Sequence, residues 1–168
     1  MKILCCDPGK LSGLSILELE DNKVEILETT ELEQYDTCEW ILDRFDSIDK
    51  VVCEDFIISP RTGKMKTSDT RFSLEITGFI RYLCIKNKKP LILQTPAHMK
   101  SFFANWSLRD FGLWSKGGEG HKRDSIRHGA VYLLGNNKWN PGNIEPTKGD
   151  YENLKEHLQK YLHFTELA

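Results

Sequence analysis

The chain has 168 residues, of which 39% are hydrophobic and 29% are charged, and its formal net charge is −2. This length suits one compact domain with at most a short appendage, and the composition excludes wholesale disorder. No apolar run is long enough to span a bilayer, and the N-terminus lacks the layout of a signal peptide. We therefore expect a soluble, cytoplasmic protein with no membrane partner.

The charge is distributed unevenly along the chain. Residues 1–58 carry 15 acidic and 5 basic side chains, whereas residues 59–138 carry 5 acidic and 15 basic ones. A basic segment of this kind fits a phosphate-rich partner such as a nucleic acid. The alternative is that the two segments pack together and neutralise each other, and the charge alone does not separate these interpretations.

The cysteines favour free thiols over a disulfide framework or a zinc site. Their number is odd, no two are spaced as a CxxC pair, and three lie within strand-like runs. The five are Cys5, Cys6, Cys38, Cys53 and Cys84.

The first part of the chain predicts three strands in series, at residues 2–7, 12–19 and 24–30. The short polar turn between the second and third strands indicates an antiparallel meander. Residues 38–48 have apolar positions at helical spacing, and residues 50–58 form a buried strand candidate. The first strand ends at an Asp-Pro-Gly turn.

The second part alternates helices and strands. A polar loop follows the strand 50–58, and a helix with one apolar face is predicted next. Thr95-Pro96 opens a further helix, since proline is tolerated in a first turn. The glycine run Gly117–Gly120 predicts a flexible loop. The predicted elements are a helix at 70–86, a strand at 90–94, a helix at 121–134, a Gly/Asn/Pro-rich stretch at 135–147 and a last helix near 150–162.

This order predicts an α/β fold. Three antiparallel strands followed by parallel βα units give a mixed five-stranded sheet with helices on both faces. We place one domain at residues 1–134 and treat residues 135–168 as a linker and a helix that pack on the same domain.

Three acidic residues stand where such a sheet brings backbone ends together. Asp7 ends the first strand, Glu54 lies in the fourth, and Asp124 lies in the opening turns of the helix 121–134. A carboxylate among apolar neighbours needs a partner, and a divalent cation with oxygen ligands supplies one. Each also has an ordinary explanation: a turn cap, a salt bridge and a helix-dipole acid. Their combination favours the metal site.

The same residues carry a family resemblance. The segments Ile3–Gly9 and Ser12–Ile16 resemble the opening strand pair of the RuvC Holliday-junction resolvases, in the RNase H-like superfamily. Val51–Glu54 is similar to the strand that ends with that family's second acidic residue. His121–Ala130 resembles its C-terminal motif, an acid or histidine followed three residues later by Asp. The resemblance covers residues 1–134 and implies an RNase H-like nuclease domain, in a bacterial or phage setting.

The resemblance implies a site and an activity. Asp7, Glu54, His121 and Asp124 would be the catalytic and metal-binding residues, holding two Mg²⁺ or Mn²⁺ ions that hydrolyse phosphodiester bonds. His121 would ligate an ion or protonate the leaving oxygen, unless it is only a loop-end residue. His128 shares a helical stripe with His121 and Asp124, and whether it touches the site or packs beneath it stays open.

The resemblance also implies DNA contacts and a homodimer. The expected partner is branched DNA, chiefly four-way junctions, whose two opposed cuts match a two-fold assembly built on the helix 70–86. Phe56 and Ile57 are candidate wedges between bases or, alternatively, core residues. The expected phosphate contacts are Arg61, Lys64, Lys66, Arg71, Lys100, Lys122, Arg123 and Arg127. Such residues position a backbone without reading its sequence.

Three rivals remain for the function. A flap, branched-DNA or RNA nuclease on the same fold would have the same carboxylates, and only substrate tests separate it from a resolvase. A non-catalytic nucleic-acid-binding module is disfavoured by the presence of all four site positions. An actin-like nucleotide-binding protein is disfavoured because the chain is too short for two lobes.

Overall fold

A computed structural model of the chain describes residues 1–55, 67–95, 105–118, 120–136, 138–139 and 165–167; side chains are described over 1–55, 70–95, 108–118, 120–136 and 138–139. The predicted wedge residues, the helix after Pro96 and the helix near 150–162 lie outside the described residues. No helix in the described ranges is long and apolar enough to cross a membrane.

The three N-terminal strands form the predicted meander. β1 (Lys2–Asp7), β2 (Leu11–Glu20) and β3 (Lys23–Glu33) pair antiparallel in chain order. The turn between β2 and β3 is tight, with left-handed φ values of 46° at Asp21 and 62° at Asn22, and aspartate and asparagine tolerate this conformation better than most residues.

Two parallel strands extend the sheet on the other side of β1. β4 (Lys50–Glu54) pairs with β1, and β5 (Leu91–Gln94) pairs with β4. The sheet order β3-β2-β1-β4-β5 confirms the predicted mixed five-stranded sheet. A short strand that the sequence did not predict, β6 (Thr165–Leu167), adds antiparallel to β5. β4 ends at Glu54, level with the last residue of β5, and residues 56–58 of the predicted strand lie outside the described residues.

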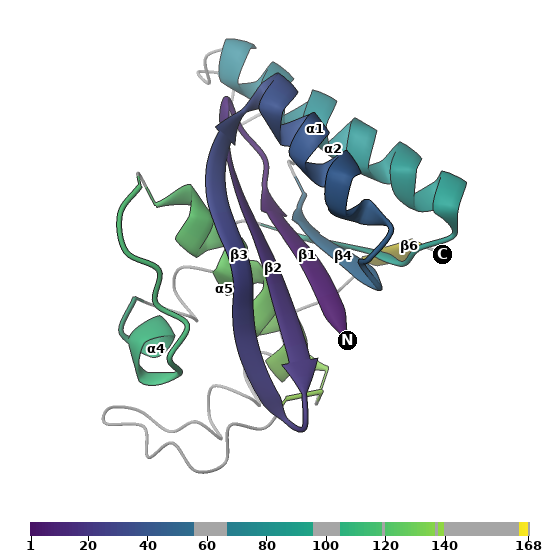
Figure 1. The fold of residues 1–168 in the computed structure, drawn as a ribbon. Coiled ribbons are helices and arrows are strands. Elements are labelled where there is room, and N and C mark those ends of the chain that lie inside the picture. The colour runs from purple at the N-terminus through teal and green to yellow at the C-terminus, as the bar shows by residue number, and fades with distance from the viewer. Residues whose placement is uncertain (56–66, 96–104, 119, 137, 140–164, 168) are drawn as a thin grey trace.

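Helices cover both faces of the sheet, as predicted (Figure 1). The helices α1 (Gln34–Phe45) and α2 (Thr67–Asn87) lie on one face, and α5 (His121–Gly135) lies on the other. α1 begins before the predicted helix 38–48. The first turn of α1 is polar, and the spacing of apolar residues in the sequence therefore does not reveal this turn. A further short helix, α4 (Asn105–Asp110), precedes the glycine-rich segment.

Alternation along the strands divides the core into two layers. Ile3 and Cys5 of β1 face α5, whereas Leu4 and Cys6 face α1 and α2. Successive strand residues point to opposite faces, and both faces are apolar because both are covered. All five cysteines are free; four of them are buried, and Cys38 is half-buried.

Two glycines allow α5 to approach the sheet closely. A Cβ atom at Gly13 of β2 would lie 2.0 Å from the carbonyl oxygen of His121. A Cβ atom at Gly129 of α5 would lie 2.5 Å from Sγ of Cys5 and from Cδ1 of Leu17. Both ends of this contact therefore need a residue without a side chain, and the start of α5 lies directly against β2.

Candidate active site

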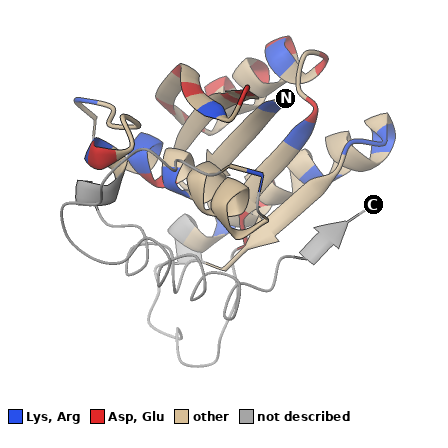
Figure 2. Cartoon of the chain, turned by 90° about the horizontal axis from the view of Figure 1, so that it is seen from below, with Lys and Arg blue, Asp and Glu red and all other residues tan. Residues whose placement is uncertain are grey.

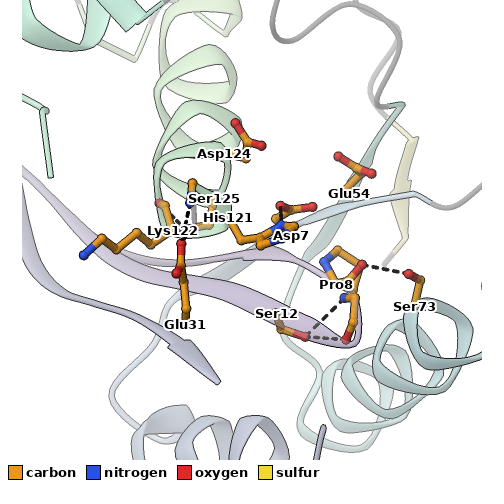
Figure 3. Close-up of polar contacts among 12 residues, drawn as sticks. Asp7, Pro8, Ser12, Glu31, Glu54, Ser73, His121, Lys122, Asp124 and Ser125 are labelled. Atoms are coloured by element: carbon orange, nitrogen blue, oxygen red, sulfur yellow. Dashed lines mark hydrogen bonds and ion pairs between the residues drawn. The ribbon is translucent and has the colours of Figure 1, made fainter. Parts of the chain in front are cut away.

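Parallel pairing places Asp7 and Glu54 side by side at one edge of the sheet. Cys6 pairs with Cys53, so the carboxylates that follow them end neighbouring strands in the same direction. The Asp7 side chain is 12% exposed and the Glu54 side chain is 20% exposed, so both are largely buried and only a small part of each is accessible to solvent. Figure 3 shows both at the strand ends, with Asp124 of α5 opposite them.

The first turn of α5 brings His121 to Asp7. The Nδ1 atom of His121 lies 3.0 Å from Oδ2 of Asp7, and the imidazole is 41% exposed (Figure 3). The hydrogen bond to Asp7 raises the pKa of His121, with partial burial opposing it and the Asp7, Glu31 and Asp124 charges adding to it. An exposed imidazole beside a carboxylate is suited to metal binding or to proton transfer.

His128 lies two turns further along α5 and contacts the second carboxylate. Its Nε2 atom lies 3.0 Å from Oε2 of Glu54, and its Nδ1 atom lies 2.7 Å from Oε1 of Gln94. The side chain is 1% exposed. The sequence left open whether His128 touches the site or packs beneath it. In the structure it does both, because its side chain is buried and contacts Glu54.

Arg127 occupies a different place from the one predicted. Its side chain is 5% exposed, and its guanidinium forms an ion pair with the carboxylate of Asp124, one turn back on α5. Burial lowers the pKa of Arg127, and the Asp124 charge opposes this shift. A buried, paired guanidinium does not present itself to a DNA backbone, so we correct its role from phosphate contact to internal counter-ion of Asp124.

Glu31 of β3 is a site-supporting residue that the sequence analysis missed. Its Oε1 atom accepts hydrogen bonds from the backbone N–H groups of Gly120, at 2.9 Å, and Lys122, at 3.1 Å. Gly120, the N-cap residue of α5, has no side chain, so a carboxylate from another element does the capping. Nothing in the sequence marks Glu31 among the other acidic residues of β3.

The chemistry of these side chains fits a divalent cation. Carboxylate oxygens and an imidazole nitrogen are suitable donors for Mg²⁺ or Mn²⁺. Asp7, Glu54 and Asp124 each contact one basic side chain, from His121, His128 and Arg127 respectively. Within the described ranges no three acidic, histidine or cysteine side chains lie close enough together to hold one ion.

The predicted phosphate-binding residues are only partly described. Arg71 of α2 is exposed and pairs with Glu75 of its own helix, Nε to Oε1 at 2.7 Å. Lys122 donates from Nζ to the carbonyl of Lys116 at 2.6 Å. Arg123 donates from Nη1 to the carbonyl of Gly117 at 2.8 Å. The other predicted contacts, Arg61, Lys64, Lys66 and Lys100, lie outside the described residues.

A stack of cationic and aromatic groups lies beside the start of α5. The guanidinium of Arg109 lies 4.2 Å from the ring centroid of Trp114, and that of Arg123 lies 5.1 Å from it. This stack links α4 to the first turn of α5. Figure 2 marks the Lys and Arg positions of the described chain in blue, and they lie on several of its elements. Gly117, Gly118 and Gly120 adopt positive φ values, which favour glycine.

The His121–Asp7 pair predicts a pH-dependent stability. Because the folded-state pKa of His121 is raised, the pair stabilises the fold fully below the ordinary histidine pKa, and the contribution disappears as pH rises through the raised value. We expect the difference in unfolding free energy between wild type and His121→Gln to shrink as pH rises above about 6.5. Urea denaturation in EDTA from pH 5.5 to 9 measures it. A difference that stays constant would contradict the pairing.

The Glu31 cap predicts a loss of stability on truncation. Glu31→Ala removes the acceptor of two backbone N–H groups, so we expect the unfolding free energy to fall by about 0.5–2 kcal/mol. Glu31→Gln keeps an acceptor and should retain most of the stability. Glu25→Ala, on the exposed face of β3, is the matched control for loss of charge. Equal urea midpoints for Glu31→Ala and Glu25→Ala would refute the capping role.

Comparison with solved structures identifies the fold. RuvC of T. thermophilus in complex with Holliday junction substrate aligns over 76% of this chain and 90% of its own, with a TM-score of 0.61 and 14% sequence identity. The chain has the RNase H-like fold of RuvC. A second structure of Thermus thermophilus RuvC aligns over the same shares with a TM-score of 0.56 and 15% identity. The Fowlpox virus resolvase, in complex with substrate Holliday junction DNA, aligns over 95% of this chain and 98% of its own at 17% identity and a TM-score of 0.41.

The likeness to RuvC is visible in the structure and not in the sequence as a whole. No family model matches the sequence, and no curated protein does. The predicted RNase H-like fold is confirmed, with a mixed sheet in the order β3-β2-β1-β4-β5 and helices on both of its faces. At this level of identity the RuvC likeness establishes the fold alone, and the roles of the site residues stay predictions.

Proposed function

We propose that this protein is a metal-dependent, structure-selective DNA endonuclease that resolves four-way junctions. The observation that carries the proposal is the convergence of Asp7, Glu54, His121 and Asp124 at one edge of a RuvC-like sheet. Three carboxylates and an exposed imidazole at a surface edge suit hydrolysis of a phosphodiester. The RuvC structure with Holliday junction substrate supports the choice of branched DNA.

Each site residue has a separate part in this proposal. Asp7, Glu54 and Asp124 would hold the metal through carboxylate oxygens, and His121 would add a nitrogen ligand or protonate the leaving oxygen. When bound, two Mg²⁺ or Mn²⁺ ions would supply Lewis-acid stabilisation of the charge that develops on the phosphate. Arg127 would keep Asp124 oriented, because the two form a largely buried ion pair, with side-chain exposures of 5% and 16%.

The basic residues near α5 supply the DNA contact in this proposal. Lys122 and Arg123 lie in the turn that presents His121, and Arg71 lies exposed on α2. Backbone contacts of this kind release counter-ions, so we expect the logarithm of junction affinity to fall steeply with the logarithm of salt concentration. Fluorescence anisotropy in Ca²⁺ from 50 to 300 mM KCl measures the slope. A flat response would mean that the basic groups serve the fold instead.

A homodimer through α2 is part of the same proposal. Leu74, Tyr82 and Ile85 are exposed apolar residues of this helix, at 42%, 60% and 66% exposure. Large apolar side chains gathered on one helix are typical of a protein contact. A two-fold dimer would place two sites on opposed strands of a junction. Sedimentation equilibrium of wild type and Ile85→Asp tests the proposed dimer. Equal masses for the two proteins would contradict a dimer through α2.

A substrate panel tests the proposed activity. Labelled four-way junction, flap, fork, duplex DNA and single-stranded RNA are incubated with Mg²⁺, Mn²⁺ or EDTA, using wild type and Glu54→Gln. We expect metal-dependent cuts on opposed strands of the junction by wild type only. Preferential cutting of flaps or RNA would favour the alternative nuclease on the same fold. Tight binding without any cutting would favour a non-catalytic nucleic-acid-binding module.

A further inference from the structure

A buried hydrogen-bonded chain ends on one of the proposed ligands. It runs from Gln94, the last residue of β5, through His128 of α5 to Glu54, the last residue of β4. Gln94 and His128 are each 1% exposed, whereas His121 is 41% exposed. The two histidines therefore have different surroundings, although each contacts a carboxylate at 3.0 Å.

The direction of these hydrogen bonds is fixed by the backbone. Nε2 of Gln94 lies 3.1 Å from the carbonyl oxygen of His128, which can only accept, so this end of the amide is its NH₂ group. The carbonyl end of the amide then faces Nδ1 of His128 at 2.7 Å, and Nδ1 must be the donor. Gln94 thus contacts His128 twice, at the backbone carbonyl and at Nδ1 of the ring, and Nε2 of His128 faces Glu54. The contact between Nε2 and Oε2 of Glu54 is a hydrogen bond when a proton lies between these two atoms.

Such a chain restricts the carboxylate that it reaches. A glutamate side chain has several rotamers, and holding it in one costs conformational entropy. The contact with His128 engages only Oε2 of Glu54, which is compatible with a ligand role for the same carboxylate. Groups that hydrogen-bond to metal-binding side chains commonly orient them in this way.

We propose that His128 and Gln94 are positioning residues that hold Glu54 in the orientation needed for metal binding. This inference rests on the proposed function, in which Glu54 is a ligand. The hydrogen bonds from Gln94 through His128 to Glu54 join β4, β5 and α5. They therefore also fix the distance between the sheet edge and the helix that carries His121 and Asp124. If the chain served only to satisfy buried polar groups, its loss would change stability without changing metal affinity.

The test separates metal affinity from stability with three variants. His128→Leu and Gln94→Leu each leave a buried partner unsatisfied, and the double variant removes both groups. Mn²⁺ is titrated at one fixed pH by calorimetry, and urea unfolding is measured in EDTA. We expect Mn²⁺ affinity to weaken by about 10–100-fold in all three. Stability should fall in the single variants and recover partly in the double variant, where fewer buried groups lack partners.

A matched control removes a buried polar contact that does not reach the carboxylates. Ser125 of α5 contacts Ser15 of β2, Oγ to Oγ at 3.0 Å, so Ser125→Ala should lower stability and leave Mn²⁺ affinity unchanged. Mn²⁺ affinity that recovers together with stability in the double variant, or that stays within twofold of wild type in all three, would overturn the inference alone. Equal Mn²⁺ affinity of wild type and Glu54→Gln would overturn both the inference and the proposed ligand role.

Discussion

Asp7→Asn is expected to lower the rate of metal-dependent junction cleavage by at least about a thousandfold, equivalent to about 4 kcal/mol of transition-state stabilisation. Asparagine has nearly the shape of aspartate and keeps an oxygen that can face His121, so the fold should persist. The substitution removes the negative charge at the centre of the proposed site, where β1 ends beside β4. Single-turnover cleavage of a labelled junction in Mg²⁺ measures the effect.

The control for this substitution lies near the other end of β1. Asp49 accepts a hydrogen bond from the backbone N–H of Lys2 at 2.7 Å, and Asp49→Asn removes the same charge away from the site. We expect that variant to cleave at the wild-type rate. Junction binding, measured with Ca²⁺, should be retained by both variants. Wild-type cleavage by Asp7→Asn would remove Asp7 from the site and leave the carboxylate set incomplete.

Gly13→Ala is expected to be the most damaging small substitution in the sheet. The added Cβ would meet the backbone of α5, 2.0 Å from the carbonyl oxygen of His121 and 2.6 Å from the amide nitrogen of Lys122. Backbone cannot rotate away as a side chain can, so β2 and α5 must separate. Overpacking of this kind costs about 1–3 kcal/mol of unfolding free energy. The displacement should also move His121 from Asp7 and reduce cleavage.

A second glycine provides the comparison. A Cβ at Gly78 of α2 has no heavy atom within 4 Å, and this position lies inside a helix. Gly78→Ala should therefore raise the unfolding free energy, by about 0.5–1 kcal/mol. Thermal and urea unfolding of both variants test the pair. Equal stability of Gly13→Ala and wild type would show that α5 adjusts to the added methyl group without cost.

The sequence predicts the sheet and the strand-end carboxylates because both depend on local patterns. Alternation and turn residues define β1, β2 and β3. Asp7 is conspicuous because it ends an apolar run, and Glu54 because it interrupts one. Asp124 lies in the opening turns of the predicted helix 121–134, and His121 enters the candidate site through the resemblance to the RuvC family. Their roles as ligands stay predictions, as does the domain boundary at residue 134.

Other parts of the site depend on contacts between distant residues. Glu31 caps a helix that begins 90 residues later, and no local pattern records that contact. Gln94 ends its strand as Glu54 does, and the two residues pair in register. A polar residue at the end of the predicted strand 90–94 is the signal that could have indicated Gln94. Arg127 has the charge of a DNA-binding residue, but its burial depends on how α5 faces the sheet.

The glycine contacts between α5 and the sheet have a consequence for protein engineering. The bare backbone at Gly13 receives the first turn of α5, while Gly129 receives side chains of β1 and β2. A chimera that takes α5 from a relative without the matching β2 strand would bring together a helix and a strand whose surfaces are not complementary. The β2 strand and α5 should therefore be exchanged together, although 100 residues separate them in the chain. Grafts of this site into another nuclease should move both segments together.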